Sequence, residues 1–269
     1  MGTALEVISG FTTAAGATQT ALTMATGDSL TIRATLPDKK VWLLNTWVDA
    51  QAAGVLRIKS PKLHDAVHGI RLRTTISEAK PLLPMDPQQR LYPQDVLSVD
   101  LSGSATAGDI ETAVLLIYYE DLPGIMARLI GEAELGRRIQ NVFGVETDLT
   151  AGTAGGWSGS RAVNADFDVF KANTDYALMG YLADVETAAI SWKGADTGNL
   201  RVGGPGDELA RHLTAEWFVR LSRLSGIPMI PVFNSANKAA ITIEVASDEN
   251  AASPKVTSLF AELGAPRPA

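Results

Sequence analysis

The first residues whose types and spacing suggest chemistry are two histidines four positions apart. They occur in His64-Asp65-Ala66-Val67-His68, and histidines at this spacing on a helix, together with a carboxylate base, bind catalytic zinc in many hydrolases. Here the acid is the short aspartate, and Pro61 and Gly69 leave room for only a very short helix. The segment therefore predicts a polar turn, and we expect no metal site.

Two glycine-rich stretches resemble other catalytic motifs. Gly203-Gly-Pro-Gly206 precedes a helical pattern, as a phosphate-binding loop does, but no Lys-Ser/Thr follows, and Asp207-Glu208 would repel an anion. Gly156-Trp157-Ser158-Gly159 approaches a nucleophile elbow but lacks the G-x-S-x-G spacing. We interpret the first as a loop before an acidic helix start, and we expect no acyl-transfer site at the second.

Trp157, in the second of these stretches, is also a candidate interface residue. It lies within the glycine-rich run 150–160, TAGTAGGWSGS. A tryptophan in such a loop usually buries itself against a neighbouring surface, and tryptophans anchor many protein interfaces. Two interpretations stay open, packing within the chain and a contact between subunits.

The remaining charged groups predict no reaction. Glu120-Asp121 and Asp248-Glu249 follow strand-like segments, but a glycosidase needs two acids that converge across a cleft. We interpret both pairs as solvated turns. Arg128, Arg137 and Arg138 lie in a helical pattern, where solvation is the default and a face toward anionic lipid is the alternative. We predict no catalytic residue, no cofactor and no enzymatic activity.

The composition narrows the class of protein further. The chain has 269 residues, of which 46% are hydrophobic and 20% charged, with no cysteine and a net charge of −7. This composition is typical of a folded chain with about two domains. The acidic balance disfavours a general nucleic-acid binder, and we expect no direct sequence-specific binding of nucleic acid. The longest apolar stretches, near residues 113–119, are far shorter than the ~20 residues that span a bilayer.

The pattern along the chain predicts strands far more often than helices. Residues 29–36 alternate between apolar and polar, and residues 41–49, VWLLNTWVD, are apolar enough for a central strand. Helical patterns occur at 125–143 and, most clearly, at 207–224, where Gly226 supplies the stop. The spacing of these elements lacks the alternating β-α-β rhythm of a parallel sheet. We therefore predict an all-β fold with a few short inserted helices.

The two halves of the chain follow a similar plan. The strand, acidic turn and strand at 43–56 match those at 178–191 with an offset of 135. A later hairpin signal also recurs, with residues 96–99 and 111–118 matching 229–233 and 239–245. We interpret this as an internal duplication. It divides the chain into a first jelly roll at 1–124, a joining helix and flexible linker at 125–160, and a second jelly roll at 161–269.

Two tandem sandwich halves, a helix at 207–224 before the last hairpin and a helical joining segment resemble the double jelly-roll major capsid proteins of tailless icosahedral viruses, the tectivirus and corticovirus type. The resemblance is architectural and spans nearly the whole chain. The proline-rich segment 64–93 departs from it, because a helix would lie there. The resemblance implies a pseudo-hexameric homotrimer that tiles a shell with minor capsid or vertex proteins. Such shells often enclose an internal lipid membrane, and the location would be the virion, after assembly in the host cytoplasm.

Two other classes of function remain as alternatives. A carbohydrate-binding or glycan-active protein built from two β-sandwiches would need exposed aromatic side chains along a groove. A phage tail or accessory structural protein would also assemble with itself, as a hexameric ring. The sequence favours the capsid protein, which requires no active site.

Overall fold

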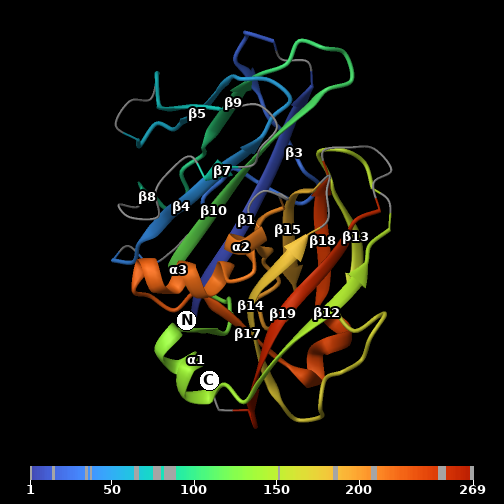
Figure 1. The fold of residues 1–269 in the computed structure, drawn as a ribbon. Helices are drawn as coiled ribbons and strands as arrows, with labels where there is room; N and C mark the ends of the chain where they lie inside the picture. The colour runs from blue at the N-terminus through green and yellow to red at the C-terminus, as the bar shows by residue number, and fades with distance from the viewer. Residues whose placement is uncertain are drawn as a thin grey trace.

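The computed structural model shows a protein whose secondary structure consists mainly of β-strands (Figure 1). It describes residues 2–13, 16–33, 36, 38–63, 67–74, 80–81, 89–150, 152–183, 187–206, 211–247 and 253–266. The strands form four antiparallel sheets, so the predicted all-β sandwich fold is confirmed. Across the described residues, no helix is both long enough and apolar enough to span a membrane.

The first sandwich consists of a large and a small sheet. The large sheet has the order β3-β1-β10-β4-β7, with β8 also paired to β4, and the small sheet has the order β2-β9-β5-β6. The strands are β1 (Gly2–Thr13), β2 (Thr20–Ala21), β3 (Thr23–Met24), β4 (Val41–Asp49), β5 (Val55–Lys59), β6 (Ile70–Arg73), β7 (Lys80–Pro81), β8 (Gln89–Leu91), β9 (Ser98–Ser102) and β10 (Ile110–Leu122).

The second sandwich is built in the same way from two sheets. Its large sheet has the order β11-β17-β14-β19-β12, and its small sheet has the order β13-β18-β15-β16. The strands are β11 (Leu129–Ile130), β12 (Asn141–Asp148), β13 (Trp157–Ala162), β14 (Asp175–Ala183), β15 (Thr187–Lys193), β16 (Val202–Pro205), β17 (Ile230–Asn234), β18 (Thr242–Ser247) and β19 (Lys255–Gly264). The helices are α1 (Glu132–Arg138), α2 (Arg211–Thr214) and α3 (Trp217–Ser225), and a 3-10 helix spans Ser235–Ala240.

The large sheet of the first sandwich is buried on both faces. In β10, residues 111–119 are all buried, and alternate residues belong to different hydrophobic clusters. Leu115 and Ile117 pack with the first sandwich's small sheet. Val114 and Leu116 belong to the cluster that contains the core of the second sandwich. Because each face of this sheet has an apolar partner, its strands are continuously hydrophobic rather than alternating.

The predicted joining helix at 125–143 is wrong in extent. Only α1 is helical, and it is preceded by β11 and followed by β12. Both strands pair with strands of the second sandwich, β11 with β17 and β12 with β19. Gly131 at the start of α1 and Gly136 within it lower the helix propensity of the segment, and strand pairing decides the conformation of the flanking residues. Much of the segment 125–160 therefore contributes to the second sandwich, including β13 at its end.

The helix predicted at 207–224 is interrupted in the structure. Residues 207–210 lie outside the described part of the chain, and α2 and α3 are separated by a turn at Ala215 and Glu216. The end of α2 lies directly against β14, since a Cβ at Gly180 would come within 2.3 Å of the Thr214 carbonyl oxygen. The predicted stop at Gly226 is confirmed, with φ 71° and its N–H bonded to Ser222 O at 2.9 Å.

The two late hairpins are wrong as pairs. β9 and β10 lie in different sheets of the first sandwich, and β17 and β18 lie in different sheets of the second. Two apolar strands joined by a polar loop give the same sequence signal whether they pair or cross from one sheet to the other. The sequence-based match of these late hairpins therefore joined strands that do not correspond in position.

Candidate interaction site

An extensive apolar contact joins the two sandwiches. Trp47 of β4 is fully buried, and its Nε1 donates a hydrogen bond of 3.0 Å to the Ala188 carbonyl of β15. Its ring meets that of Trp217 on α3 edge to face, with centroids 6.0 Å apart. The backbone N–H of Val7 also donates to Arg201 O at 2.8 Å. The contact therefore combines side-chain packing with backbone bonding, which is typical of a permanent interface.

Trp157 lies at the rim of this contact, at the start of β13. Its Nε1 donates to Asp28 Oδ2 of the first sandwich at 2.7 Å. Arg201 stacks on the indole, with its guanidinium 5.2 Å from the ring centroid, and donates to both Asp28 and Glu244 at 2.7 Å. We call Asp28, Trp157, Arg201 and Glu244 the junction cluster. The expected contact between copies at Trp157 stays a prediction, and the indole has a clear role within the chain.

Charged and hydrogen-bonding groups from both sandwiches surround Asp28. Burial raises the pKa of Asp28, although the bonds from Ser9 N, Trp157 and Arg201 oppose the rise. Nearby, Glu6 accepts hydrogen bonds from Arg33 and from the Tyr119 hydroxyl, the latter at 2.8 Å. Burial, followed by the charge of Glu6, holds the pKa of Tyr119 well above its ordinary value. Each of these carboxylates has specific partners, so they stabilise the fold rather than stand ready for proton transfer.

A second charged cluster fixes the segment around α1 to the second sandwich. Asp175 on β14 is fully buried and accepts hydrogen bonds from Arg128 at 2.7 Å, Arg138 at 3.2 Å and Asn234 at 3.0 Å. Burial acts to raise the pKa of Asp175, but these donors outweigh it, and the pKa lies below its ordinary value. Arg128 and Arg138 therefore serve this internal cluster, and the solvation interpretation is wrong for Arg138, which is buried. Arg137 is exposed, as the solvation interpretation predicts.

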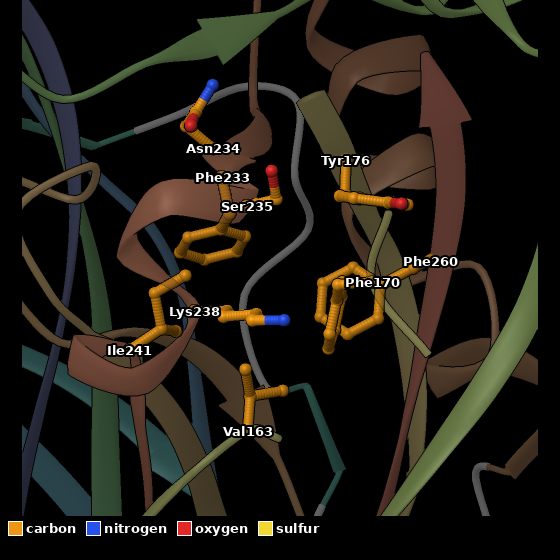
Figure 2. A pocket seen from close by; sticks show the side chains of 9 residues that line it. All are labelled: Val163, Phe170, Tyr176, Phe233, Asn234, Ser235, Lys238, Ile241 and Phe260. Carbon is orange, nitrogen blue, oxygen red and sulfur yellow. The ribbon is translucent and has the colours of Figure 1, made fainter. Parts of the chain in front are cut away.

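One crevice opens at the side of the second sandwich (Figure 2). It encloses about 180 Å³, counted together with the solvent at its mouth, whereas ligand pockets usually have 300–1,000 Å³. The ring of Phe170 packs against those of Tyr176 and Phe260, with centroids 5.0 and 5.3 Å apart, and Lys238 reaches Asp168 at 2.6 Å. The aromatic rings therefore fill the space, and the crevice is part of the core.

The glycine-rich stretches serve close strand packing. Gly203 and Gly204 belong to β16, and a Cβ at Gly203 would come within 1.8 Å of the Ile190 carbonyl oxygen on β15. The interpretation of Gly203–Gly206 as a loop is therefore wrong for its first three residues, which lie in a strand, while Asp207-Glu208 lie outside the described residues. Gly156 precedes β13, and Ser158 and Gly159 lie within it.

The structure describes only part of the candidate histidine pair and acid pairs. His64 lies outside the described residues, and so does the pair Asp248-Glu249. Glu120 accepts a hydrogen bond from the Lys40 backbone N–H at 2.9 Å. Among the residues that the structure describes, no group of three histidine, aspartate or glutamate side chains is arranged to hold a metal ion.

In the part of the chain that the structure describes, two outer sheet faces carry exposed side chains, and sequence reasoning missed both. On the small sheet of the first sandwich, Arg57, Lys59, Arg71 and Arg73 share the face opposite the core side chains Leu56 and Ile58. We call these four residues the basic face. They alternate with apolar residues in β5 and β6, a signal that is readable in the sequence once the strands are known.

The second open face belongs to the large sheet of the second sandwich. In β12 the exposed residues Val142, Gly144, Glu146 and Asp148 alternate with more buried ones. We call Val142, Glu146 and Asp148 the acidic face. Lys255 of β19 lies beside its carboxylates, 3.2 Å from Asp148 and 3.8 Å from Glu146. The predicted helix at 125–143 overlaps only the first three residues of this strand.

Comparisons with known proteins give no family for this chain. No family model matches it, and no curated protein matches its sequence. Among solved structures, the PBSX exported protein XepA is similar over 93% of this chain and 88% of its own, with 11% identity and a TM-score of 0.22. The recombinant N-glycanase F, PNGase F, is similar over 98% and 97%, with 9% identity and a TM-score of 0.23. Likenesses this weak identify neither fold family nor activity.

Proposed function

We propose that this protein is a structural component that assembles with copies of itself, as a viral capsid protein forming pseudo-hexameric homotrimers and then a shell. The observation that carries the proposal is the contact between unlike faces inside one chain. The outer face of the first sandwich's large sheet packs on the second sandwich's small sheet, through Val7, Trp47 and Ala188. A contact between unlike faces leaves one of each kind free, and its repetition produces rings or filaments.

The order of the strands supports a repeating unit. Eight strands of the first sandwich have the orders β1-β10-β4-β8 and β2-β9-β5-β6, and eight of the second have β12-β19-β14-β17 and β13-β18-β15-β16. In chain order these are the same arrangement, with strands one, eight, three and six in one sheet and two, seven, four and five in the other. This order supports the proposal of a jelly roll in each half. Three chains would supply six such units to one ring.

The arrangement of tryptophans gives the glycan alternative less support. Trp47, Trp192 and Trp217 are buried in the core, and Trp42 and Trp157 are partly buried against it. Trp157 also donates to Asp28. Aromatic platforms that bind sugars need exposed ring faces, and none of these five indoles is exposed. The tail-protein alternative shares the self-assembly and differs in the symmetry of the ring.

Mass measurement in solution tests the proposal. Purified chain is examined by light scattering and sedimentation over a wide concentration range. We expect a species of three times the chain mass, or larger particles. A monomer at every concentration would overturn the proposal, and a hexameric ring would favour the tail protein.

A further inference from the structure

The two open sheet faces carry opposite charge, and their positions match the two faces that are joined inside the chain. The basic face lies on the small sheet of the first sandwich, and the acidic face lies on the large sheet of the second. The internal contact joins the other large sheet to the other small sheet. We infer that the basic face of one copy binds the acidic face of the next through an ionic contact that salt can reverse. This inference rests on the proposed self-assembly and names the surfaces that would carry it.

The basic face has an excess of positive charge that its own sheet does not neutralise. Arg57 and Lys59 share one carboxylate, Asp100, at 2.5 and 2.8 Å. Burial acts to raise the pKa of Asp100, but the bonds from Lys59 and Arg57 keep it below its ordinary value, so this carboxylate is charged at neutral pH. Arg71 and Arg73 on the edge strand β6 are exposed. Four cations therefore face one anion within the described part of this sheet.

The acidic face combines charge with apolar surface. The side chains of Glu146 and Asp148 are about half exposed, with one cation, Lys255, between them. Val142 on the same face is 51% exposed, and Leu182 on β14 is 36% exposed. The hydrogen bond from Trp192 to Ser258 fixes the orientation of β19, because Ser258 must face the core. Leu259 and Thr257 therefore point outward, toward this open side of the sheet, as do the carboxylates.

The corresponding internal contact is built differently, which indicates a distinct role for the charged one. In the first sandwich, the row Arg71, Arg57 and Asp100 crosses the small sheet. In the second, the row Gly203, Ser191 and Glu244 crosses the small sheet, and Ser191 is fully buried. The small side chains of Gly203 and Ser191 allow the permanent close contact inside the chain, where Glu244 is paired with Arg201. The long charged side chains of the basic face suit a contact between copies that electrostatic attraction guides and that salt reverses.

A charge-exchange experiment on the full chain tests this inference. The variants are Arg71→Glu with Arg73→Glu, Glu146→Lys with Asp148→Lys, and the chain that combines all four changes. Two single variants form a matched pair. Arg71→Glu changes the basic face, and Arg90→Glu, the control, changes an exposed arginine on β8. Sedimentation equilibrium at 0.05 M and 1 M salt gives each association constant, and circular dichroism verifies that each variant folds.

We expect wild-type association to weaken at least about tenfold at high salt, since the Debye length falls to about 3 Å at 1 M. Each two-residue variant should lose association at low salt, the combined variant should regain it, and Arg90→Glu should leave it unchanged. Association that is indifferent to salt, or that survives both two-residue variants, would overturn the ionic contact and leave self-assembly standing. A wild-type chain that is monomeric at low salt would overturn both proposals.

Discussion

The buried contact between the sandwiches predicts that the protein unfolds as one unit. Trp47 offers the sharpest perturbation, because it is fully buried, donates to the Ala188 carbonyl and meets Trp217 edge to face. Replacing a buried tryptophan by alanine typically costs about 3–5 kcal/mol of unfolding free energy. Trp47→Phe keeps most of the volume but leaves the Ala188 carbonyl without its donor, at a cost of about 1–3 kcal/mol.

Chemical and thermal denaturation, followed by tryptophan fluorescence and circular dichroism, measure both losses. For a chain of this size, 1 kcal/mol lowers the melting temperature by about 2–4 °C, so Trp47→Ala should lower it by roughly 10 °C. Trp42→Ala, in the same strand but only partly buried, is the matched control and should cost less. The wild type and every variant should unfold in a single transition. Two transitions, with only the first-sandwich transition moved by Trp47→Ala, would refute the idea that the contact unites the sandwiches.

Three further changes probe the clusters described above. Asp175→Asn should cost about 3–5 kcal/mol at neutral pH, because it leaves Arg128 and Arg138 without a buried anion. The lowered pKa of Asp175 means that its contribution is present above pH 3.8 and is lost as the pH falls through the folded-state pKa, so the difference from wild type should shrink in acid denaturation curves; a constant difference would contradict this. Trp157→Phe should lower stability by about 1–3 kcal/mol through the lost bond to Asp28, and an unchanged assembly mass would assign the indole to the junction alone. Gly203→Val should prevent correct pairing of β15 with β16, seen as loss of soluble folded protein, whereas normal folding would show that the close approach is not required.

The class of fold could be predicted because alternation in a strand reports directly on one-sided burial. Residues 41–49 and 55–59 formed the expected strands β4 and β5, which pair with other elements than each other. Strand pairing itself was not predictable, since apolar strands such as β9 and β10 give the same signal whether they share a sheet or face each other across a core. The helical pattern around α1 failed for a related reason. Its flanks are apolar at helical spacing, and only pairing with β17 and β19 shows that they are strands.

The candidate site was less accessible to sequence reasoning than the fold. Trp157 was singled out for its ring, and the sequence could not name its partner within the chain, because Asp28 is 129 positions away. The basic and acidic faces depend on which residues of β5, β6 and β12 point outward, and this follows from register rather than from local charge. In contrast, the glycines at 203–206 attracted a chemical interpretation because a sequence does not show that their small size serves the packing of β16 on β15.

The most direct test of self-assembly is electron microscopy of the purified chain at low salt. A head-to-tail arrangement of three chains predicts particles with six lobes around a centre, single or joined into curved shells. Isolated two-lobed particles at every concentration would contradict it.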